Sequence, residues 1–117
     1  MKLVIEILSI IISLSIWQVS LSQSLITVKQ DGTGDFTTIQ QGVDAATDGD
    51  TVLVWPGTYY EHVSVAGKNI TLGSLTLISG DSSFAKLTIV DGAYSGACLE
   101  IRECAGLIHI NGFTVIH

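Results

Sequence analysis

The chain has 117 residues, enough for one domain, and carries a formal net charge of −6 at pH 7. With only five Lys and Arg residues it cannot neutralise a phosphate backbone well, so we expect no nucleic-acid partner. Frequent Val, Ile, Thr and Gly with a single proline favour an all-β fold. Nothing in the composition indicates a cofactor or an oligomeric state.

Residues 1–22 have the pattern of a signal peptide. Lys2 supplies a positive start, residues 7–16 form an apolar run, and Ser20 to Ser22 offer small residues for cleavage before Gln23. The run is shorter than the about 20 apolar residues that span a bilayer, which favours a signal peptide over a membrane anchor. We therefore expect a protein that is secreted or displayed at the cell surface, with no stable membrane insertion after cleavage.

Residues 28–63 predict a strand, a Gly/Asp turn, a short helix, another turn and a new strand. The helix is expected near residues 37–46, with Asp35 or Thr37 as its cap and with Ile39, Val43 and Ala46 on one face. Gly42 weakens such a helix, which must then depend on packing. A short amphipathic helix before a β array suits a plug over the open end of a solenoid.

Apolar-x-apolar triplets then recur in three series. The first series comprises residues 52–54, 75–77 and 99–101; the second 63–65, 87–89 and 108–110; the third 70–72 and 113–115. Turn signals separate the triplets at 56–57, 67–69, 80–81, 91–92 and 111–112, and residues 93–97 predict a loop. Three short strands per step of roughly 21–24 residues predict a three-sided parallel coil.

A leucine-rich repeat has a similar period. Leu72, Leu75 and Leu77 fit the start of that pattern, but the positions one step later, around Leu99 and Leu107, do not repeat it. The β-helix is the better interpretation.

Several short motifs resemble the opening segment of pectinesterases. They are DGTGDF (31–36), TIQ (38–40), VDAA (43–46), PGTY (56–59), EHV (61–63) and KNITL (68–72). Similar segments open carbohydrate lyases, periplasmic solenoids and non-catalytic surface proteins. The resemblance implies a right-handed, three-sided parallel β-helix of the pectin-lyase-like class with an N-terminal capping helix. Residues 48–50 depart from the pattern, because the family often has a longer turn with basic residues there.

The resemblance also implies where catalysis would lie. Pectinesterases are expected to use two carboxylates and an arginine from coils beyond the opening segment, one carboxylate as nucleophile and the other as proton donor. Residues 64–117 do not match those later motifs, and Arg102, the only arginine, is not assigned to them. We therefore predict no catalytic residue in this chain, and we expect residues 23–117 to be the incomplete N-terminal part of a β-helix domain.

Asp31, Asp35, Asp48 and Asp50 could gather around a calcium ion, but Asp-Gly pairs are ordinary turn formers and no calcium-loop spacing accompanies them. We predict turns and caps, with no metal site. Cys98 and Cys104 could pair only across a sharp chain reversal, so unpaired thiols are an equal alternative, and no zinc spacing is present.

Glu100, Arg102 and His109 alternate with apolar residues and should project from the outer face of their strands. By resemblance to the class, the outer grooves bind long sugars, which makes these three the candidate polysaccharide contacts; a solvated surface is the alternative. Trp55, Tyr59 and Tyr60 could stack on sugar rings, but aromatic residues beside a turn more often pack.

The sequon Asn69-Ile70-Thr71 has meaning only in a host that N-glycosylates proteins, and a strand position would make it a chance match.

Three hypotheses remain. The chain is the N-terminal part of a secreted polysaccharide-processing β-helix protein of pectinesterase or lyase type, or of a non-catalytic surface β-helix that binds glycans or mediates adhesion. Alternatively it is a small structural module, which would be monodisperse and melt cooperatively, whereas the apolar strand at residues 112–117 predicts aggregation.

Overall fold

The computed structural model describes residues 23–93, 98–102 and 107–116. The predicted signal peptide, Cys104 and most of the predicted loop at 93–97 lie outside the described residues. Among the described helices, none is both long and apolar enough to cross a bilayer.

Nine short strands and three short helices make up the described part of the chain. The strands are β1 (Leu25–Val28), β2 (Thr51–Val54), β3 (Gly57–Tyr60), β4 (Val63–Ala66), β5 (Thr71–Ser74), β6 (Thr88–Asp91), β7 (Leu99–Arg102), β8 (His109–Asn111) and β9 (Thr114–Ile116). The helices are α2 (Ile39–Ala45), α3 (Thr76–Ser79) and α4 (Ser83–Leu87).

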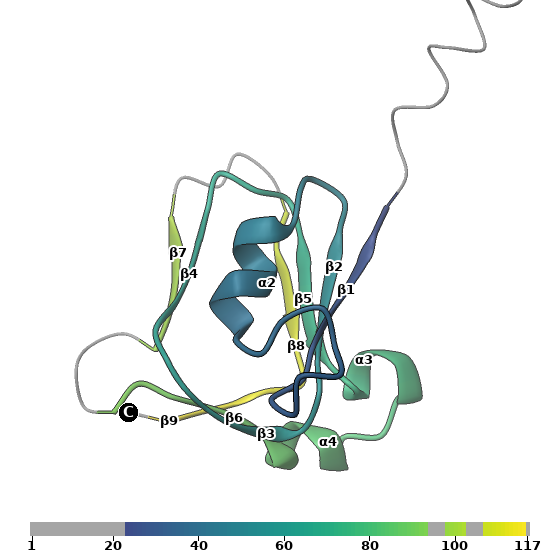
Figure 1. The fold of residues 1–117 in the computed structure, drawn as a ribbon, viewed down its shortest axis with the longest axis vertical. Helices are drawn as coiled ribbons and strands as arrows, with labels where there is room; N and C mark the ends of the chain where they lie inside the picture. The colour runs from purple at the N-terminus through teal and green to yellow at the C-terminus, as the bar shows by residue number, and fades with distance from the viewer. Residues whose placement is uncertain (1–22, 94–97, 103–106, 117) are drawn as a thin grey trace, which may run out of the picture.

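All strand pairs are parallel, and they form three sheets. Sheet A has the order β1-β2-β5-β8, sheet B the order β3-β6-β9, and sheet C consists of β4 and β7. The chain passes from sheet A to sheet B to sheet C and then returns to sheet A, and the sheets lie on three sides around α2 (Figure 1). The prediction of parallel β-structure is confirmed.

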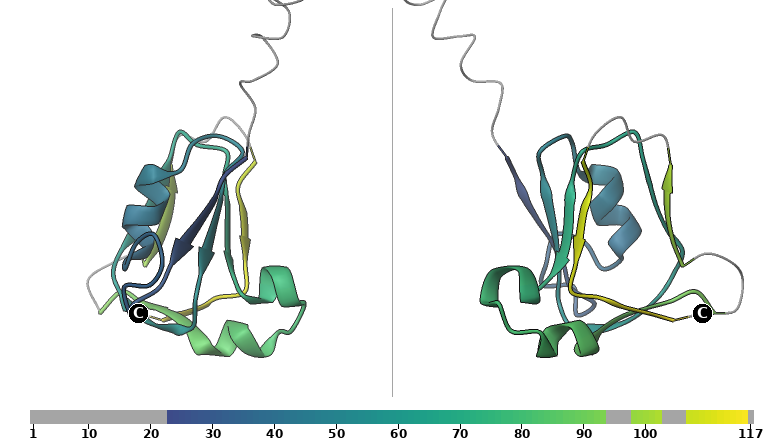
Figure 2. Two further views of the ribbon diagram at one scale, coloured as in Figure 1. Left: turned by 45° about the vertical axis from the view of Figure 1, so that its right-hand side comes forward. Right: turned by 180° about the vertical axis from the view of Figure 1, so that it is seen from behind.

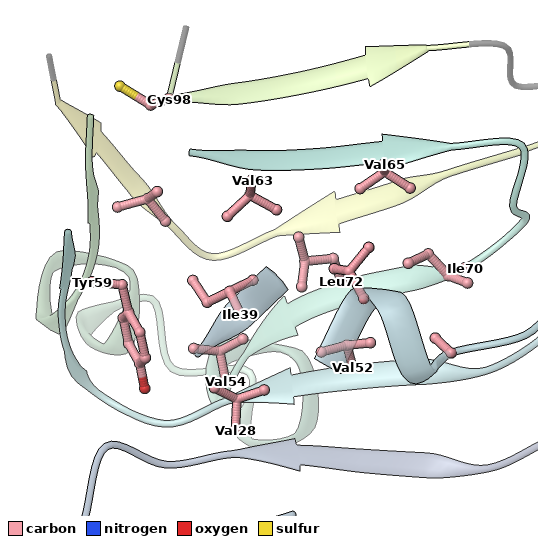
Figure 3. Packing of buried hydrophobic residues seen from close by; sticks show 13 residues of the cluster. Val28, Ile39, Val52, Val54, Tyr59, Val63, Val65, Ile70, Leu72 and Cys98 are labelled. Atoms are coloured by element: carbon pink, nitrogen blue, oxygen red, sulfur yellow. The ribbon is translucent and has the colours of Figure 1, made fainter. Parts of the chain in front are cut away.

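The core fills the space between the sheets. Because side chains alternate along a strand, Val52 and Val54 point into the core from β2, and Val63 and Val65 do so from β4. Ile39 of α2 packs among these valines (Figure 3). Because the strands pair in register, the inward-facing apolar side chains of one strand lie beside those of the next strand in the sheet.

The helix α2 confirms the predicted helix but not its predicted cap. Thr38, not Asp35 or Thr37, is the N-cap, and its hydroxyl accepts a hydrogen bond from the Gln41 N–H at 3.3 Å. Gly42 faces sheet A so closely that an added Cβ would lie 2.8 Å from Val28 Cγ2 and 3.0 Å from Val52 Cγ1. The glycine that weakens the isolated helix is the residue that lets it approach the sheet.

Each predicted triplet series was expected to form one sheet, but the strands pair in a different grouping. Thr51 of β2 pairs with Thr71 of β5 and not with the triplet at 75–77, while Val63 of β4 pairs with Leu99 of β7 and not with Leu87. Residues 76–79 form α3 instead of a strand. The predicted turn at 56–57 is also wrong at Gly57, which begins β3.

There are two causes: β3 begins where a turn was predicted, and a helical segment is inserted between β5 and β6. This segment, α3 and α4, lengthens one coil and lies outside the three sheets (Figure 2). Leu53 faces outward, yet it is buried, and its register partner is Gly73. A Cβ on Gly73 would lie 2.8 Å from Leu77 Cδ2, so α3 covers the outer face of sheet A at this point.

The apolar layers become exposed in the last coil. Val90 of β6 is 4% exposed, whereas its register partner Val115 of β9 is 48% exposed. Likewise Val65 of β4 is fully buried and its partner Ile101 of β7 is 49% exposed. Apolar side chains continue to face inward in the last described strands, but there solvent contacts one side of them.

Candidate functional site

Residues from several of the motifs that resemble the pectinesterase opening meet at α2. The helix lies against β4, β1 and β2 (Figures 1 and 2). The side chains of Glu61 and Lys68 bond to the backbone at its two ends. We call this arrangement the helix clamp and define it by Gln40, Glu61 and Lys68.

Glu61 holds the N-terminus of α2. Its carboxylate accepts hydrogen bonds from the backbone N–H of Ile39 at 3.1 Å and of Gln40 at 2.8 Å. The first N–H groups of a helix have no partner within the helix, and the helix dipole makes that end favourable for an anion. Glu61 therefore supplies both the missing acceptors and the charge.

The side-chain amide of Gln40 makes the hydrogen bonds that a further strand would make at the edge of sheet C. Its Nε2 donates to the Ser64 carbonyl at 3.1 Å, and its Oε1 accepts from the Ser64 N–H at 2.7 Å. A neighbouring strand would make the same two bonds. Because β4 is the first strand of sheet C, its free edge would otherwise be open to pairing with another chain. The Gln40 amide covers that edge at its centre.

Lys68 holds the C-terminus of α2. Its Nζ donates to the carbonyl groups of Val43 at 2.8 Å and Asp44 at 2.9 Å. The last carbonyls of a helix lack intrahelical donors, and the dipole favours a cation there. The clamp therefore complements both ends of the helix with the opposite charge.

The four aspartates considered for calcium are turn residues, as predicted. The backbone N–H and hydroxyl of Thr33 lower the pKa of Asp31, and those of Thr27 lower the pKa of Asp35. The backbone N–H groups of Thr47 and Ser24 do the same for Asp50.

Asp48 accepts the N–H of Asn69 at 2.9 Å. Within the described ranges, no group of three or more His, Cys, Asp or Glu side chains could hold a metal ion.

The three candidate polysaccharide contacts face outward but do not form one cluster. Glu100 and Arg102 are neighbours on one face of β7 in sheet C, with Arg102 Nη2 2.5 Å from Glu100 Oε1. His109 is exposed on β8 in sheet A, in register with Thr71. The Glu100–Arg102 pair and His109 therefore lie on two different sheets.

The three aromatic candidates differ in their surroundings. Tyr59 is buried in the core, and its hydroxyl donates to the Trp55 carbonyl at 2.9 Å; burial raises the pKa of Tyr59 to about 12. The Lys29 ammonium lies 4.2 Å from the Trp55 ring centroid, so one face of that ring is occupied. Packing is confirmed for Tyr59, whereas Tyr60 is 74% exposed.

Cys98 is a buried, free thiol, and its Sγ donates to the Ile116 carbonyl at 2.6 Å. This contact joins the start of β7 to the end of β9.

Sequence reasoning missed the helix clamp. Gln40, Glu61 and Lys68 are separated by more than twenty and by seven residues, and no local periodicity links them. The available signal was the resemblance itself, because all three residues lie within the quoted motifs.

Comparison with known proteins gives one informative similarity. The chain is 39% identical over 75 residues to Pectinesterase 1 of Solanum lycopersicum. The alignment covers 56% of this chain but only 13% of the relative, so the chain spans a small part of that protein. No family model matches the chain, and no solved structure matches it.

Proposed function

We propose that this chain is the N-terminal cap and first coils of a secreted, right-handed parallel β-helix of the pectin-lyase-like class. Its parent protein processes a polysaccharide, by pectinesterase or lyase chemistry. The segment itself seals and starts the stack of coils and contributes no catalytic group.

The helix clamp is the observation that carries this proposal. A solenoid exposes core and strand edges at its first coil unless something covers them. Here α2 places Ile39 and Val43 on the apolar layer, and Gln40 pairs with the free edge of β4. An arrangement of this kind serves as the beginning of a stack, and the partial similarity to a pectinesterase supports the same assignment.

The aspartates of the segment suit structure better than chemistry. Backbone N–H donors lower the pKa values of Asp31, Asp35 and Asp50, so these carboxyl groups are ionised at neutral pH and are poor proton donors. Ester hydrolysis needs a carboxylate nucleophile beside a second carboxyl group that can donate a proton. We therefore assign the reacting groups to later coils of the parent.

A second candidate function is glycan binding without catalysis. It is favoured by the exposed polar pair Glu100 and Arg102 on the outer face of sheet C, which offers an acceptor and a fork of donors to sugar hydroxyl groups. His109 is a separate proposed contact on sheet A. Under either function, Glu100, Arg102 and His109 are polysaccharide contacts.

The test is to follow the reading frame past His117 and to express the complete protein. We expect further coils with paired aspartates and an arginine, and release of methanol from esterified pectin or formation of an unsaturated product. Substituting either of the paired aspartates with asparagine should abolish that activity.

Retention on a glycan array without turnover would replace the first function with the second. A complete protein without added coils and without effect on polysaccharides would contradict both.

A further inference from the structure

The chain contains a single N-glycosylation sequon, Asn69-Ile70-Thr71. Its position relative to the strands decides whether the asparagine is accessible. Asn69 is exposed and lies in the turn that joins β4 to β5, two residues before the strand begins. Ile70 is buried, and Thr71 is the first residue of β5. The acceptor asparagine is therefore outside the sheet, although the sequon continues into it.

The backbone of Asn69 is anchored on both sides. Its N–H donates to Asp48 Oδ1 at 2.9 Å, and its carbonyl accepts from the Gly49 N–H at 2.7 Å. These bonds tie the β4–β5 turn to the turn before β2 at the upper end of the molecule (Figure 1). Neither bond uses the side-chain amide, so a sugar on that amide leaves both of them intact.

We propose that Asn69 is an N-glycosylation site. This proposal rests on the secreted location given under the proposed function. The side-chain amide nitrogen bonds to C1 of an oligosaccharide carried on a lipid diphosphate. The bond between C1 and the diphosphate oxygen breaks, the diphosphate leaves with the lipid, and the amide loses one proton to a base. The Thr71 hydroxyl completes the acceptor sequence.

The glycan has a defined place in the fold. Lys68, the residue before Asn69, contacts the C-terminal carbonyls of α2, and Asp48 and Gly49 hold the backbone of Asn69 itself. The sugar therefore lies at the corner where α2, β2 and β5 meet. Glu100 and Arg102 are on β7 of sheet C, so this carbohydrate is on a different sheet from that proposed contact pair, whereas His109 of β8 is in register with Thr71 of the sequon.

The experiment is secretion of the full chain from insect cells, followed by intact mass measurement of the protein in the medium. We expect a mass increase of one glycan that peptide N-glycosidase removes, leaving an aspartate in place of Asn69. Asn69→Gln and Thr71→Val should abolish the increase, whereas Thr71→Ser should retain it because serine keeps the hydroxyl. Asn111→Gln should change nothing, since Asn111 is followed by Gly112 and Phe113.

Two outcomes distinguish a failure of the glycosylation proposal from a failure of the proposed secretion. Unmodified protein in the medium overturns the glycosylation proposal and leaves the secreted location intact. If the chain stays in the cytosol, the predicted signal peptide fails, and the same chain is then placed behind the host's own secretory leader. A missing glycan on the protein secreted in that second arm overturns the proposal, and a glycan lost on Asn69→Gln supports it.

Discussion

At one end of the parallel sheets the helix α2 covers the core, while at the other end β7, β8 and β9 carry half-exposed apolar side chains. Ile39 of α2 is fully buried, and Ile101 of β7, also an inward-facing isoleucine, is 49% exposed. The same residue type therefore has a different energetic role at each end. The comparison teaches that the apolar interior is covered by α2 at one end, whereas at β7, β8 and β9 it is half exposed to solvent.

The largest difference between the ends should come from truncating these two isoleucines. Ile39→Ala should lower the free energy of unfolding by about 2–5 kcal/mol, because it leaves a cavity under the helix. Ile101→Ala should cost about 1 kcal/mol or less, since half of the side chain is already in water. Urea denaturation measures both, and Ile39→Val, at about 0.5–1.5 kcal/mol, is the milder variant if the alanine variant does not fold. Equal losses at the two positions would contradict the comparison.

Gly42→Ala should be the next largest effect. Alanine favours a helix by about 1 kcal/mol over glycine, but its Cβ would overlap Val28 and Val52, and overpacking costs about 1–3 kcal/mol. We expect a net loss of up to about 2 kcal/mol in the same denaturation experiment. Gln41→Ala, on the exposed side of the helix, should stay within about 0.5 kcal/mol. A stabilised Gly42→Ala variant would show that α2 is not pressed against sheet A.

Glu61→Gln tests the charge at the N-terminus of α2. The amide has one acceptor oxygen in place of two and no charge, so we expect a loss of about 1–2 kcal/mol. Glu100→Gln is the matched control at the other end, where the carboxylate pairs with Arg102 on the surface, and it should change stability by at most about 0.5 kcal/mol. Thermal melts of the two variants give the comparison directly, and similar shifts would refute it.

Variants of Gln40 can distinguish the contribution of its hydrogen-bond donor from that of its acceptor. Gln40→Glu keeps an acceptor for the Ser64 N–H and loses the donor to the Ser64 carbonyl, whereas Gln40→Ala loses both. Hydrogen exchange at the Ser64 amide should accelerate more in the alanine variant, by an amount that corresponds to about 1 kcal/mol per bond lost. Unchanged exchange in both variants would mean that Gln40 does not cover the strand edge.

We expect the smallest effect from the turn aspartates Asp35 and Asp50, and it should depend on pH. Their folded-state pKa values are lowered, so their stabilisation is present above the unfolded pKa of about 3.9 and is lost as the pH falls through the folded value. Denaturation between pH 7 and pH 2 should therefore show stability falling below about pH 4. Asp50→Asn should reduce that slope, and an unchanged slope would remove Asp50 from the explanation.

Local features could be predicted from the sequence, whereas the matching of one coil to the next could not. The helix near residues 37–46 and the strands at 52–54 and 63–65 follow from patterns within a few residues. Leu75 and Leu77 satisfy the same apolar alternation, but a turn and a short helix place Leu77 over Gly73 instead. Alternation alone does not distinguish these outcomes, and the insertion of α3 and α4 lengthens the step from β4 to its partner β7.

The candidate site was predicted only in part. The outward-facing positions of Glu100, Arg102 and His109 follow from alternation, but their separation onto two sheets depends on strand order. The bonds of Glu61 and Lys68 to α2 join residues more than twenty positions apart, and such contacts have no signature in the local pattern.

The helix clamp also gives the chain an order of assembly. All of its members precede β5, so α2, β4 and their mutual contacts are available before the residues of β6 to β9 have been synthesised. Chains emerge from the ribosome N-terminus first, and long-range strand pairing is the slow step in parallel sheets. The early contacts of α2 with β4 give β7 a preformed edge on which to pair, and Gln40 occupies the other edge of β4. Sheet C can therefore extend from β4 only on the side where β7 pairs.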